Sequence, residues 1–361
     1  MKKVTIKDIA ALAGVSRGTV DRALNNRGKI DPQKKKLILS IAKKLGYEKN
    51  IIASTLAQNK EINIAVVLPD PSRDVFWNLP IRGIERSRRF ISHYGISTQF
   101  YYFNIFDKED FISQLRSAMA SQPQAILTAP IYREESVRFL QVALQNNVPV
   151  FTINTELNHK DILCFIGQNS YQCGLLAGRL LNNGKKHGAT FLALTLGHES
   201  KNAAHIYEKV RGLKDYGLKN DLDNVIIDKA IENFADKEVL INESKKILIE
   251  NPEIEGILFT NSRAYHFLDN IVYQEILHKP ITTVGFDLIP ENINLLLGDK
   301  IDFLINQDPI KQGYLGMVNI LNHFVYNKSI DHKQYIPADI VVKENYELYM
   351  KEMETNLELV Y

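Results

Sequence analysis

Side chains suited to nucleic-acid contacts are concentrated in residues 15–30, close to the start of the chain. Arg17 and Arg22 lie five positions apart on a predicted short helix, and arginine is the side chain that binds guanine O6 and N7 with two hydrogen bonds. Ser16 and Thr19 can hydrogen-bond phosphate at the start of that helix, where free backbone N–H groups also attract anions. The spacing therefore predicts a helix that contacts DNA through its first turns.

Two helices are predicted on either side of a glycine-containing turn. Thr5 is a suitable N-cap with Asp8 at the third helical position, and Gly14 suits the left-handed residue that ends a helix. Ser16 is the expected N-cap of the second helix. This order is typical of the helix-turn-helix motif, whose second helix enters the major groove of DNA. A packed helical hairpin with arginines on its surface is the alternative that the spacing alone leaves open.

Positive charge is concentrated in the same part of the chain. Residues 1–60 contain 14 Lys and Arg against 4 Asp and Glu, a net charge of +10, whereas residues 61–361 contain 30 against 38, a net charge of −8. A third helix, predicted to begin at the Asp31-Pro32 pair and to stop at Gly46, carries several of these lysines. The asymmetry predicts a basic module for a polyanion joined to an acidic body, with a merely solvated basic face as the alternative.

The motifs of this module resemble those of a known family. VTIKDIAALAGVSRGTVDRALN closely resembles the opening of the lactose-repressor (LacI) family of bacterial transcription regulators, and GYEKNIIASTLA is similar to its hinge helix. The resemblance implies that Arg17 and Gly18 stand where family members read bases. It also implies that Leu56 is wedged into the minor groove, where an apolar side chain unstacks and kinks the duplex. The DNA-binding residues implied in this way are Thr5, Ser16, Arg17, Gly18, Thr19, Arg22, Asn25, Asn50, Ala53, Leu56 and Ala57.

Three positions depart from the family pattern. Gly18 has no side chain, so one usual base contact is missing. Asp21 stands where serine is common, and an acid there should avoid phosphate and orient a neighbouring arginine instead. Lys49 replaces the frequent proline before the hinge helix. These departures change the operator sequence that one would expect and leave the identity of the module unchanged.

The rest of the chain alternates short apolar runs with amphipathic helical stretches. Runs such as INIAVVLPD, AILTAP and TTVGFD are followed by stretches such as DFISQLRSAMASQ. Strand and helix alternating at this spacing predict parallel sheets covered by helices on both faces, and the number of runs favours two lobes. The predicted fold is an all-α helix-turn-helix module (1–48), a hinge helix and linker (49–60), and an α/β body of two doubly wound parallel-sheet lobes (61–361).

The body resembles the effector domain of the LacI family, which is similar to a periplasmic sugar-binding protein with its ligand between two lobes. The resemblance implies a homodimer, or a higher oligomer, that binds a roughly palindromic double-stranded DNA operator and responds to a small carbohydrate. Phe76 and Trp77 would present aromatic faces to the C–H face of a sugar while polar groups bind its hydroxyls. The implied effector-binding residues are Asp74, Phe76, Trp77, Arg133, Asn154, Asn169, Lys209, Asn261, Asp287 and Gln307.

Each of these residues also has a purely structural interpretation. A polar residue that ends a strand is usually a turn or cap residue, and Phe76 and Trp77 could belong to the core. Lys209 stands for an arginine and lacks the planar fork of that side chain. Asn154 and Asn169 stand where the family often has acids, so neutral amides would bind the hydroxyls there.

The sequence shows no catalytic, metal or cofactor motif, and we expect a binding protein that is no enzyme and needs no cofactor. Cys164 and Cys173 are expected to be reduced, buried thiols, which together with the absence of a secretory signal predicts a cytoplasmic protein. No apolar run approaches the roughly 20 residues that span a bilayer, so no membrane partner is expected. A sugar-binding protein whose module no longer regulates transcription, and an enzyme on a doubly wound fold, remain as alternatives.

Overall fold

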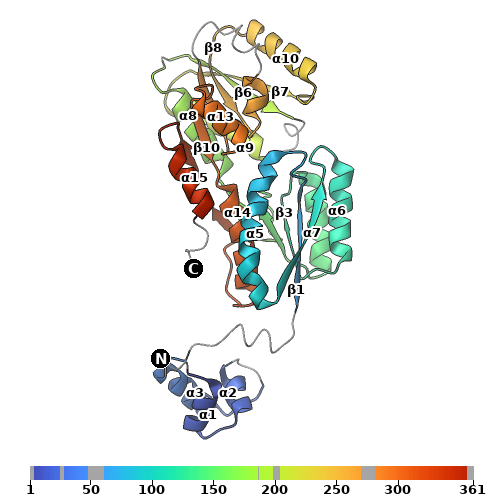
Figure 1. The fold of residues 1–361 in the computed structure, drawn as a ribbon, viewed down its shortest axis with the longest axis vertical. Coiled ribbons are helices and arrows are strands. Elements are labelled where there is room, and N and C mark those ends of the chain that lie inside the picture. The colour runs from blue at the N-terminus through green and yellow to red at the C-terminus, as the bar shows by residue number, and fades with distance from the viewer. Residues whose placement is uncertain are drawn as a thin grey trace. The chain divides into compact units, whose positions relative to one another are not determined.

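The structure is a computed structural model that describes residues 4–24, 28–47, 61–185, 187–197, 204–269 and 281–355. The chain divides into two compact units, Met1–Gln58 and Asn59–Tyr361 (Figure 1). The described part contains no helix that is long and apolar enough to cross a membrane.

The first unit contains three short helices around a small core of its own. The helices are α1 (Ile6–Ala13), α2 (Arg17–Leu24) and α3 (Pro32–Lys44). The Asp31 carboxylate caps α3 by accepting a hydrogen bond of 2.9 Å from the N–H of Lys34, as the sequence predicted. The buried side chains of this core are Ile9, Ala10, Val20, Ala23, Ile38 and Ala42. Because every helix contributes to the core, α2 is held in place while its outer face remains in solvent.

The second unit contains two sheets, and each sheet forms the centre of a lobe (Figure 1). In lobe 1 the strands lie in the order β11 (Lys333–Tyr335), β5 (Ile162–Gly167), β4 (Val150–Ile153), β3 (Ala125–Thr128), β1 (Ile62–Pro69) and β2 (Ile96–Phe103). In lobe 2 the order is β12 (Asp339–Val341), β10 (Phe303–Asn306), β9 (Thr282–Phe286), β8 (Ile254–Phe259), β6 (Thr190–Leu196) and β7 (Val225–Ile231). All neighbouring strands are parallel except β10 and β12. The predicted doubly wound fold is confirmed.

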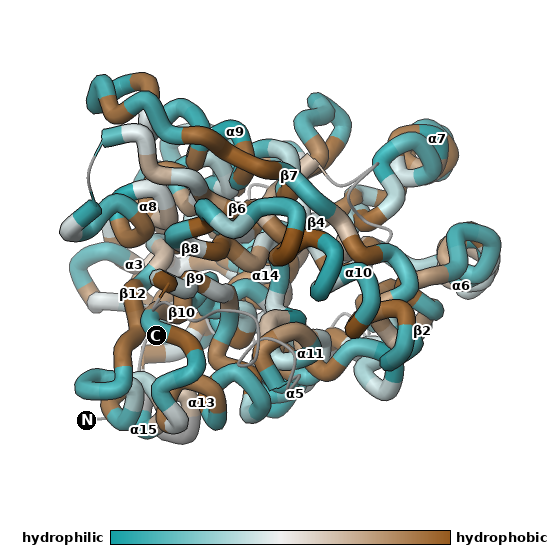
Figure 2. The backbone as a smooth tube through the Cα atoms, turned by 90° about the horizontal axis from the view of Figure 1, so that it is seen from above, coloured by the Kyte–Doolittle hydropathy of each residue, from teal (hydrophilic) through white to brown (hydrophobic). Residues whose placement is uncertain are grey.

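The helices cover the sheets, and the chain passes from one lobe to the other just before two of them. The helices of this unit are η1 (Val75–Trp77), α5 (Asn78–Ile91), η2 (Ser92–Tyr94), α6 (Lys108–Ala120), α7 (Arg133–Gln145), α8 (Ser170–Leu181), α9 (Ala204–Lys219), α10 (Lys237–Glu250), α11 (Ala264–Leu268), α13 (Pro290–Leu297), α14 (Pro309–Phe324) and α15 (Tyr346–Thr355). Helix α8 follows β5 of lobe 1 but packs on α9 in lobe 2, and α14 follows β10 of lobe 2 but packs on α5 in lobe 1. Along the outer helices α7 and α10 hydrophilic and hydrophobic residues alternate, as expected for helices with one buried face (Figure 2).

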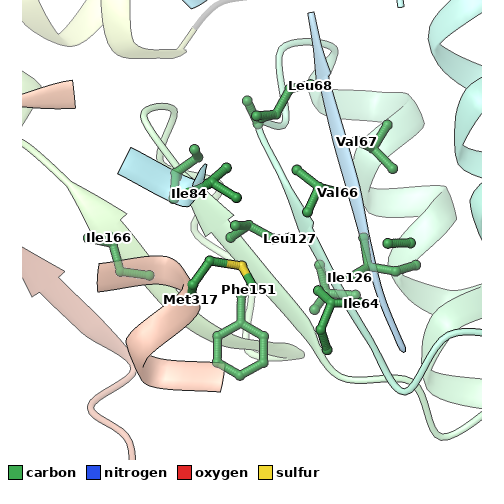
Figure 3. Close-up of a cluster of buried hydrophobic side chains, with 14 of the residues drawn as sticks. Ile64, Val66, Val67, Leu68, Ile84, Ile126, Leu127, Phe151, Ile166 and Met317 are labelled. Carbon is green, nitrogen blue, oxygen red and sulfur yellow. The ribbon is translucent and has the colours of Figure 1, made fainter. Parts of the chain in front are cut away.

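The core of lobe 1 lies between its parallel strands and the helices on their faces. Val66 of β1, Leu127 of β3 and Phe151 of β4 lie against Met317 of α14 and Ile84 of α5 (Figure 3). Apart from the exposed Asn63 of β1, the residues of these central strands are buried, and their sequences are mostly apolar without a regular polar alternation. The carboxyl ends of such strands are where an α/β protein places its ligand.

The two lobes repeat the same arrangement. Counted along the chain, the five parallel strands of each lobe occupy the same places in the sheet order, from β1 to β5 and from β6 to β10. The sequence carries the repeat as well: IGQN at the end of β5 corresponds to INQD at the end of β10. Asn169 and Asp308 are accordingly the N-cap residues of α8 and α14. The repeat identifies pairs of positions that meet at the cleft between the lobes.

Candidate functional site

The first turn of α2 forms the exposed surface on which the sequence predicts DNA contacts. Ser16, Arg17 and Gly18 are exposed, and Ser16 Oγ accepts a hydrogen bond of 3.2 Å from the N–H of Thr19. The Arg22 side chain is exposed on the same helix, and its Nε donates a hydrogen bond of 3.2 Å to the carbonyl oxygen of Gly18. Both arginines therefore lie on the solvent side of α2, near residues able to bind phosphate.

The other predicted DNA-binding residues have different positions. Thr5 donates hydrogen bonds from its N–H (2.8 Å) and its hydroxyl (2.7 Å) to the Asp8 carboxylate, which fixes the start of α1. Its role toward DNA remains a prediction. The residues that lie outside the described part of the chain are Asn25, Asn50, Ala53, Leu56 and Ala57, together with the whole predicted hinge, 49–60.

The predicted effector site corresponds to a cavity between the two lobes. Its lining residues follow the carboxyl ends of strands in both sheets or lie on the helices beyond them. They are Asp74, Phe76, Trp77, Ile105, Ile131, Asn154, Gln168, His205, Lys209, Asn261, Ser262, Arg263, Asp287 and Gln307. Eight of the ten residues that the sequence singled out line this cavity, and Arg133 and Asn169 do not. The geometry thus gathers residues from positions 74 to 307 at one place.

The two residues outside the cavity have structural positions. Asn169 is the N-cap of α8, and its Oδ1 accepts a hydrogen bond of 3.0 Å from the N–H of Gln172. Arg133 is the exposed first residue of α7. The neighbouring Gln168 lines the cavity instead of Asn169. The internal repeat explains why Gln168 and not Asn169 lines the cavity. Gln168 corresponds to Gln307, which also lines it, and Asn169 corresponds to Asp308, the N-cap of α14.

Asp287 is the most deeply buried acid of the cavity. Its carboxylate accepts hydrogen bonds of 2.9 and 2.8 Å at its two oxygens from Nε2 of Gln307. Burial raises the pKa of Asp287 to about 6, against the lowering effects of the Lys209 ammonium and the Gln307 hydrogen bonds. The carboxylate is therefore an acceptor held in one orientation and largely ionised at neutral pH.

Lys209 provides the positive charge next to this acid. Its side chain is 2% exposed, its Nζ donates a hydrogen bond of 3.0 Å to the Thr260 carbonyl oxygen, and it lies 3.6 Å from the centre of the Phe286 ring. A Cβ atom at Gly174 would lie 2.0 Å from the Lys209 carbonyl oxygen, so glycine in α8 lets α9 approach closely. This close packing holds Lys209 at the floor of the cavity.

Asn154 and Asp287 occupy corresponding positions at the ends of β4 and β9. Both have left-handed backbones, with φ of 66° and 69°, a conformation that asparagine and aspartate tolerate better than most residues. On the lobe 2 side, Asn292 holds the loops, because its Nδ2 donates hydrogen bonds of 2.9 Å to the carbonyl oxygens of Ser262 and Phe286. The strand ends that carry the polar side chains are thus fixed by the fold.

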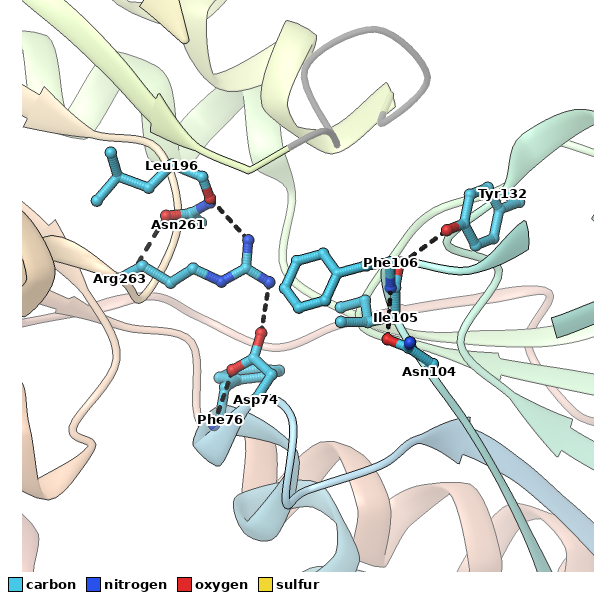
Figure 4. Close-up of polar contacts among 9 residues, drawn as sticks. All are labelled: Asp74, Phe76, Asn104, Ile105, Phe106, Tyr132, Leu196, Asn261 and Arg263. Carbon is cyan, nitrogen blue, oxygen red and sulfur yellow. Dashed lines mark hydrogen bonds and ion pairs between the residues drawn. The ribbon is translucent and has the colours of Figure 1, made fainter. Parts of the chain in front are cut away.

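Arg263 connects the two lobes across the cavity. Its Nη2 lies 2.6 Å from Asp74 Oδ2 of lobe 1, and its Nη1 donates a hydrogen bond of 2.7 Å to the Leu196 carbonyl oxygen (Figure 4). The guanidinium lies 5.3 and 5.1 Å from the ring centres of Phe106 in lobe 1 and Phe234 in lobe 2. The side chain is 4% exposed, so this ion pair is buried, and breaking it leaves a buried charge to be satisfied by another group.

Aromatic residues form the lobe 1 wall of the cavity. Phe76 and Trp77 are buried and pack edge to face, with ring centres 5.1 Å apart. They therefore belong to the core of lobe 1 and line the cavity at the same time. The internal repeat pairs Phe76 with His205 of α9. Phe76 lies six positions before Arg82-Gly83, and His205 lies six positions before Arg211-Gly212. Burial, Lys209 and Arg263 lower the pKa of His205 to about 3, which keeps this ring uncharged.

Several lining residues were missed by the sequence analysis. They are Ile105, Ile131, Gln168, His205, Ser262 and Arg263. Gln168 and His205 could have been found from the internal repeat, which pairs them with Gln307 and Phe76. No local signal marks Arg263, since its partner Asp74 is 189 positions away.

The described residues contain no cluster of three or more His, Cys, Asp or Glu side chains that could hold a metal ion. The two cysteines are buried, and burial raises the pKa of Cys164 to about 12 and that of Cys173 to about 11. Their thiols are therefore protonated and poorly reactive at neutral pH.

Comparisons with known proteins agree with both units. The family model "Periplasmic binding protein domain" matches residues 64–328, and "Bacterial regulatory proteins, lacI family" matches residues 5–50. The HTH-type transcriptional regulator MalR of Streptococcus pneumoniae is 25% identical over 353 residues, which cover 94% of this chain and 99% of that protein.

Solved structures show the same fold for the second unit. A LacI transcriptional regulator from Bacteroides fragilis superimposes with a TM-score of 0.72 at 22% identity, over 80% of this chain and 100% of that one. GanP, a glucose-galactose binding protein from Geobacillus stearothermophilus, superimposes with a TM-score of 0.68 at 24% identity, over 79% of this chain and 99% of that one. The chain, with its helix-turn-helix unit and its periplasmic binding protein domain, belongs to the LacI family of bacterial regulatory proteins.

Proposed function

We propose that this LacI-family transcription regulator responds to a small, neutral carbohydrate bound between the lobes of its second unit. The observation that carries the proposal is the convergence of polar side chains from both lobes beside the Phe76–Trp77 wall. Carboxylate and amide groups bind sugar hydroxyls, and aromatic faces pack on the C–H groups of a sugar ring. The similarity to a glucose-galactose binding protein supports the same class of ligand.

The charges of the cavity favour a neutral ligand. Lys209 and Arg263 are balanced by Asp74 and Asp287, and His205 is uncharged at neutral pH. Because these charges already balance one another, an added anionic or cationic group would bring a buried charge that no remaining opposite charge compensates. A hydroxyl group is both a donor and an acceptor, so it can satisfy an acid and a guanidinium alike.

One residue that lines the cavity carries an acceptor without a hydrogen-bond partner among the described residues. Within the described residues, Gln307 Oε1 is buried and accepts no hydrogen bond. The amide nitrogen of the same side chain is fixed on Asp287, so the oxygen has a defined direction. A ligand hydroxyl that donates to this oxygen would remove the free-energy cost of a buried unsatisfied acceptor, about 1–3 kcal/mol.

Ligand binding requires a change in the lobe arrangement. The cavity has a volume of about 40 Å³, which accommodates a few water molecules, whereas small-molecule pockets usually measure roughly 300–1,000 Å³. The Asp74–Arg263 ion pair joins the two lobes at the cavity, and we expect it to separate or rearrange when a sugar is bound. Such a rearrangement is what can couple ligand binding to DNA binding.

We further propose that the protein acts by binding and without catalysis, in the cytoplasm, as a homodimer on a roughly palindromic operator. A two-fold operator requires two helix-turn-helix units, one for each half-site. The membership in a family of DNA-binding regulators supports this assembly.

A ligand screen by thermal shift tests the carbohydrate proposal. Neutral pentoses and hexoses are tested alongside their phosphates, and a neutral sugar is expected to raise the melting temperature. At 100 times its Kd, a ligand stabilises the folded state by about 2.7 kcal/mol. A response to sugar phosphates alone, or to no carbohydrate at all, would contradict the proposal. The sugar found is then added to a gel-shift assay with operator DNA selected from a random pool.

Effector binding should depend on pH through Asp287. Its pKa of about 6 lies above that of the unfolded chain, so this group stabilises the folded protein most below about pH 4 and loses that contribution as the pH rises through 6. Effector affinity should change with pH in the opposite direction, because the ionised carboxylate is a stronger hydrogen-bond acceptor than the protonated carboxyl group. We expect affinity for the effector to be constant above pH 7 and to fall as the pH drops below 6, as measured by calorimetry. A flat affinity between pH 5 and 8 would contradict this role.

A further inference from the structure

The chain passes between the lobes at three short crossover segments, 168–169, 307–308 and 336–338, which connect β5 to α8, β10 to α14 and β11 to β12. Any rotation of one lobe against the other must change the backbone dihedral angles of these segments, because they are the covalent connections between the two lobes. The first residues of the first two segments, Gln168 and Gln307, also line the cavity. The floor of the cavity is therefore part of the hinge.

One buried side chain contacts both of these segments. Gln312, on the first turn of α14 and 0% exposed, donates from Nε2 to Gln168 Oε1 at 3.2 Å and to the Gln307 carbonyl oxygen at 2.9 Å. A single amide group thus joins the crossover that leaves lobe 1 to the crossover that leaves lobe 2.

The contacts continue from Gln312 to the polar ends of both lobes. Gln168 Nε2 lies 3.5 Å from the Asn154 carbonyl oxygen in lobe 1, and Gln307 Nε2 binds both oxygens of Asp287 in lobe 2. Asn154 and Asp287 are the corresponding residues at the ends of β4 and β9. A hydrogen-bonded series of buried side chains and main-chain carbonyl groups therefore runs through the hinge and ends at the cavity on each side.

Two observations separate this amide from an ordinary core residue. The internal repeat places Cys173 at the corresponding position of α8, five residues after Gln168, so the repeat itself does not require an amide there. Among the described residues, Gln312 Oε1 is buried without a hydrogen-bond partner, a state that disfavours folding. An apolar residue of the same length would avoid that cost, whereas only a donor group can join the two segments.

We infer that Gln312 is a positioning residue that sets the relative orientation of the two crossover segments, and with them the two halves of the cavity. It does not touch the ligand site itself. Its effect on the response to an effector rests on the proposed function, whereas its effect on the hinge does not. The test is therefore made without ligand or DNA, so that its failure would leave the carbohydrate proposal untouched.

The test compares full-length wild-type protein with Gln312→Met, which keeps the length of the side chain and removes both donated hydrogen bonds. Hydrogen exchange measured by mass spectrometry should become faster in both crossover segments at once, by about tenfold, the factor that one lost hydrogen bond produces in an opening equilibrium. Trp77 is the single tryptophan of the sequence, lines the cavity and is 2% exposed. Acrylamide quenching of its fluorescence should increase as the cleft opens.

Asn319→Leu is the matched control. Asn319 lies two turns further along α14, and its Nδ2 donates a hydrogen bond of 2.8 Å to Gln334 Oε1 of β11, away from the cavity. This variant should lower the melting temperature at least as much as Gln312→Met, with unchanged quenching of Trp77 and unchanged exchange at 168–169 and 307–308. If Gln312→Met is insoluble, Gln312→Leu removes the same donors with a shorter apolar side chain.

Three results would overturn the inference. The first is a Gln312→Met protein whose hydrogen-exchange rates in both crossover segments equal those of the wild type. The second is an exchange rate that rises in only one of the two segments. The third is an equal change in exchange and in Trp77 quenching for the Gln312 and Asn319 variants. Faster exchange at both segments with greater quenching of Trp77, seen in the Gln312 variant alone, supports it.

Discussion

Asp287→Ala is expected to abolish the response of DNA binding to the effector at concentrations that saturate the wild-type protein. The carboxylate is the buried acceptor that Gln307 fixes at the floor of the cavity. Each hydrogen bond to a charged group contributes about 1.5–3 kcal/mol, so the loss of this acid should reduce effector affinity by one to two orders of magnitude or more. Operator affinity in the absence of effector should be unchanged, because the first unit is intact.

Asp302→Ala serves as the control for this substitution. Asp302 also accepts hydrogen bonds, from the N–H and the hydroxyl of Thr283, but it lies just before β10, at the end of that strand opposite to the cavity. Calorimetric titration of both variants with the identified sugar, followed by gel shifts, separates the site from general destabilisation. An Asp287→Ala protein that responds at the wild-type effector concentration would remove this residue from the binding site.

Arg17→Ala is expected to weaken binding to the selected operator by about tenfold to 100-fold, the effect of losing one bidentate contact to a base. Arg17 is the exposed first residue of α2, where a recognition helix meets base edges. The loss should be confined to one base position in each half-site, and discrimination at that position should relax. Affinity for random DNA should fall much less.

The measurement is a titration of operator, of single-base variants and of random duplexes at fixed salt, since phosphate contacts make every affinity salt-dependent. Arg88→Ala is a charge-matched control, because Arg88 is an exposed arginine of α5 that forms an ion pair with Glu85 on the same helix. Equal losses on operator and random DNA for Arg17→Ala would show that this arginine positions the protein and does not read a base.

Features encoded by neighbouring residues could be predicted from the sequence. The cap at Asp31, the turn at Gly14 and the apolar strands each depend on a few adjacent side chains, and the structure has them where they were expected. Asp287 was predicted from the resemblance to the LacI family, and its place directly after a buried strand of a parallel sheet agrees with a position at the ligand edge.

Features that depend on distant residues could not be predicted in this way. Arg263 becomes part of the cavity only because Asp74 and Phe106 of the other lobe surround its guanidinium. Asn169 was predicted from the family pattern, but in the structure it caps α8, and the neighbouring Gln168 lines the cavity. Tertiary structure, and not local pattern, sets both outcomes.

The internal repeat has a consequence for how a ligand is oriented. Two identical half-sites facing each other would accept an unsymmetrical molecule equally well head-first or tail-first, and neither lobe could tell its ends apart. In this protein the corresponding positions have diverged, with Asn154 opposite Asp287 and Phe76 opposite His205. One lobe offers a neutral amide and an aromatic face, and the other offers a carboxylate and an imidazole. The two sides of the cavity therefore differ chemically, and the two opposite orientations of a bound sugar make different contacts and have different affinities.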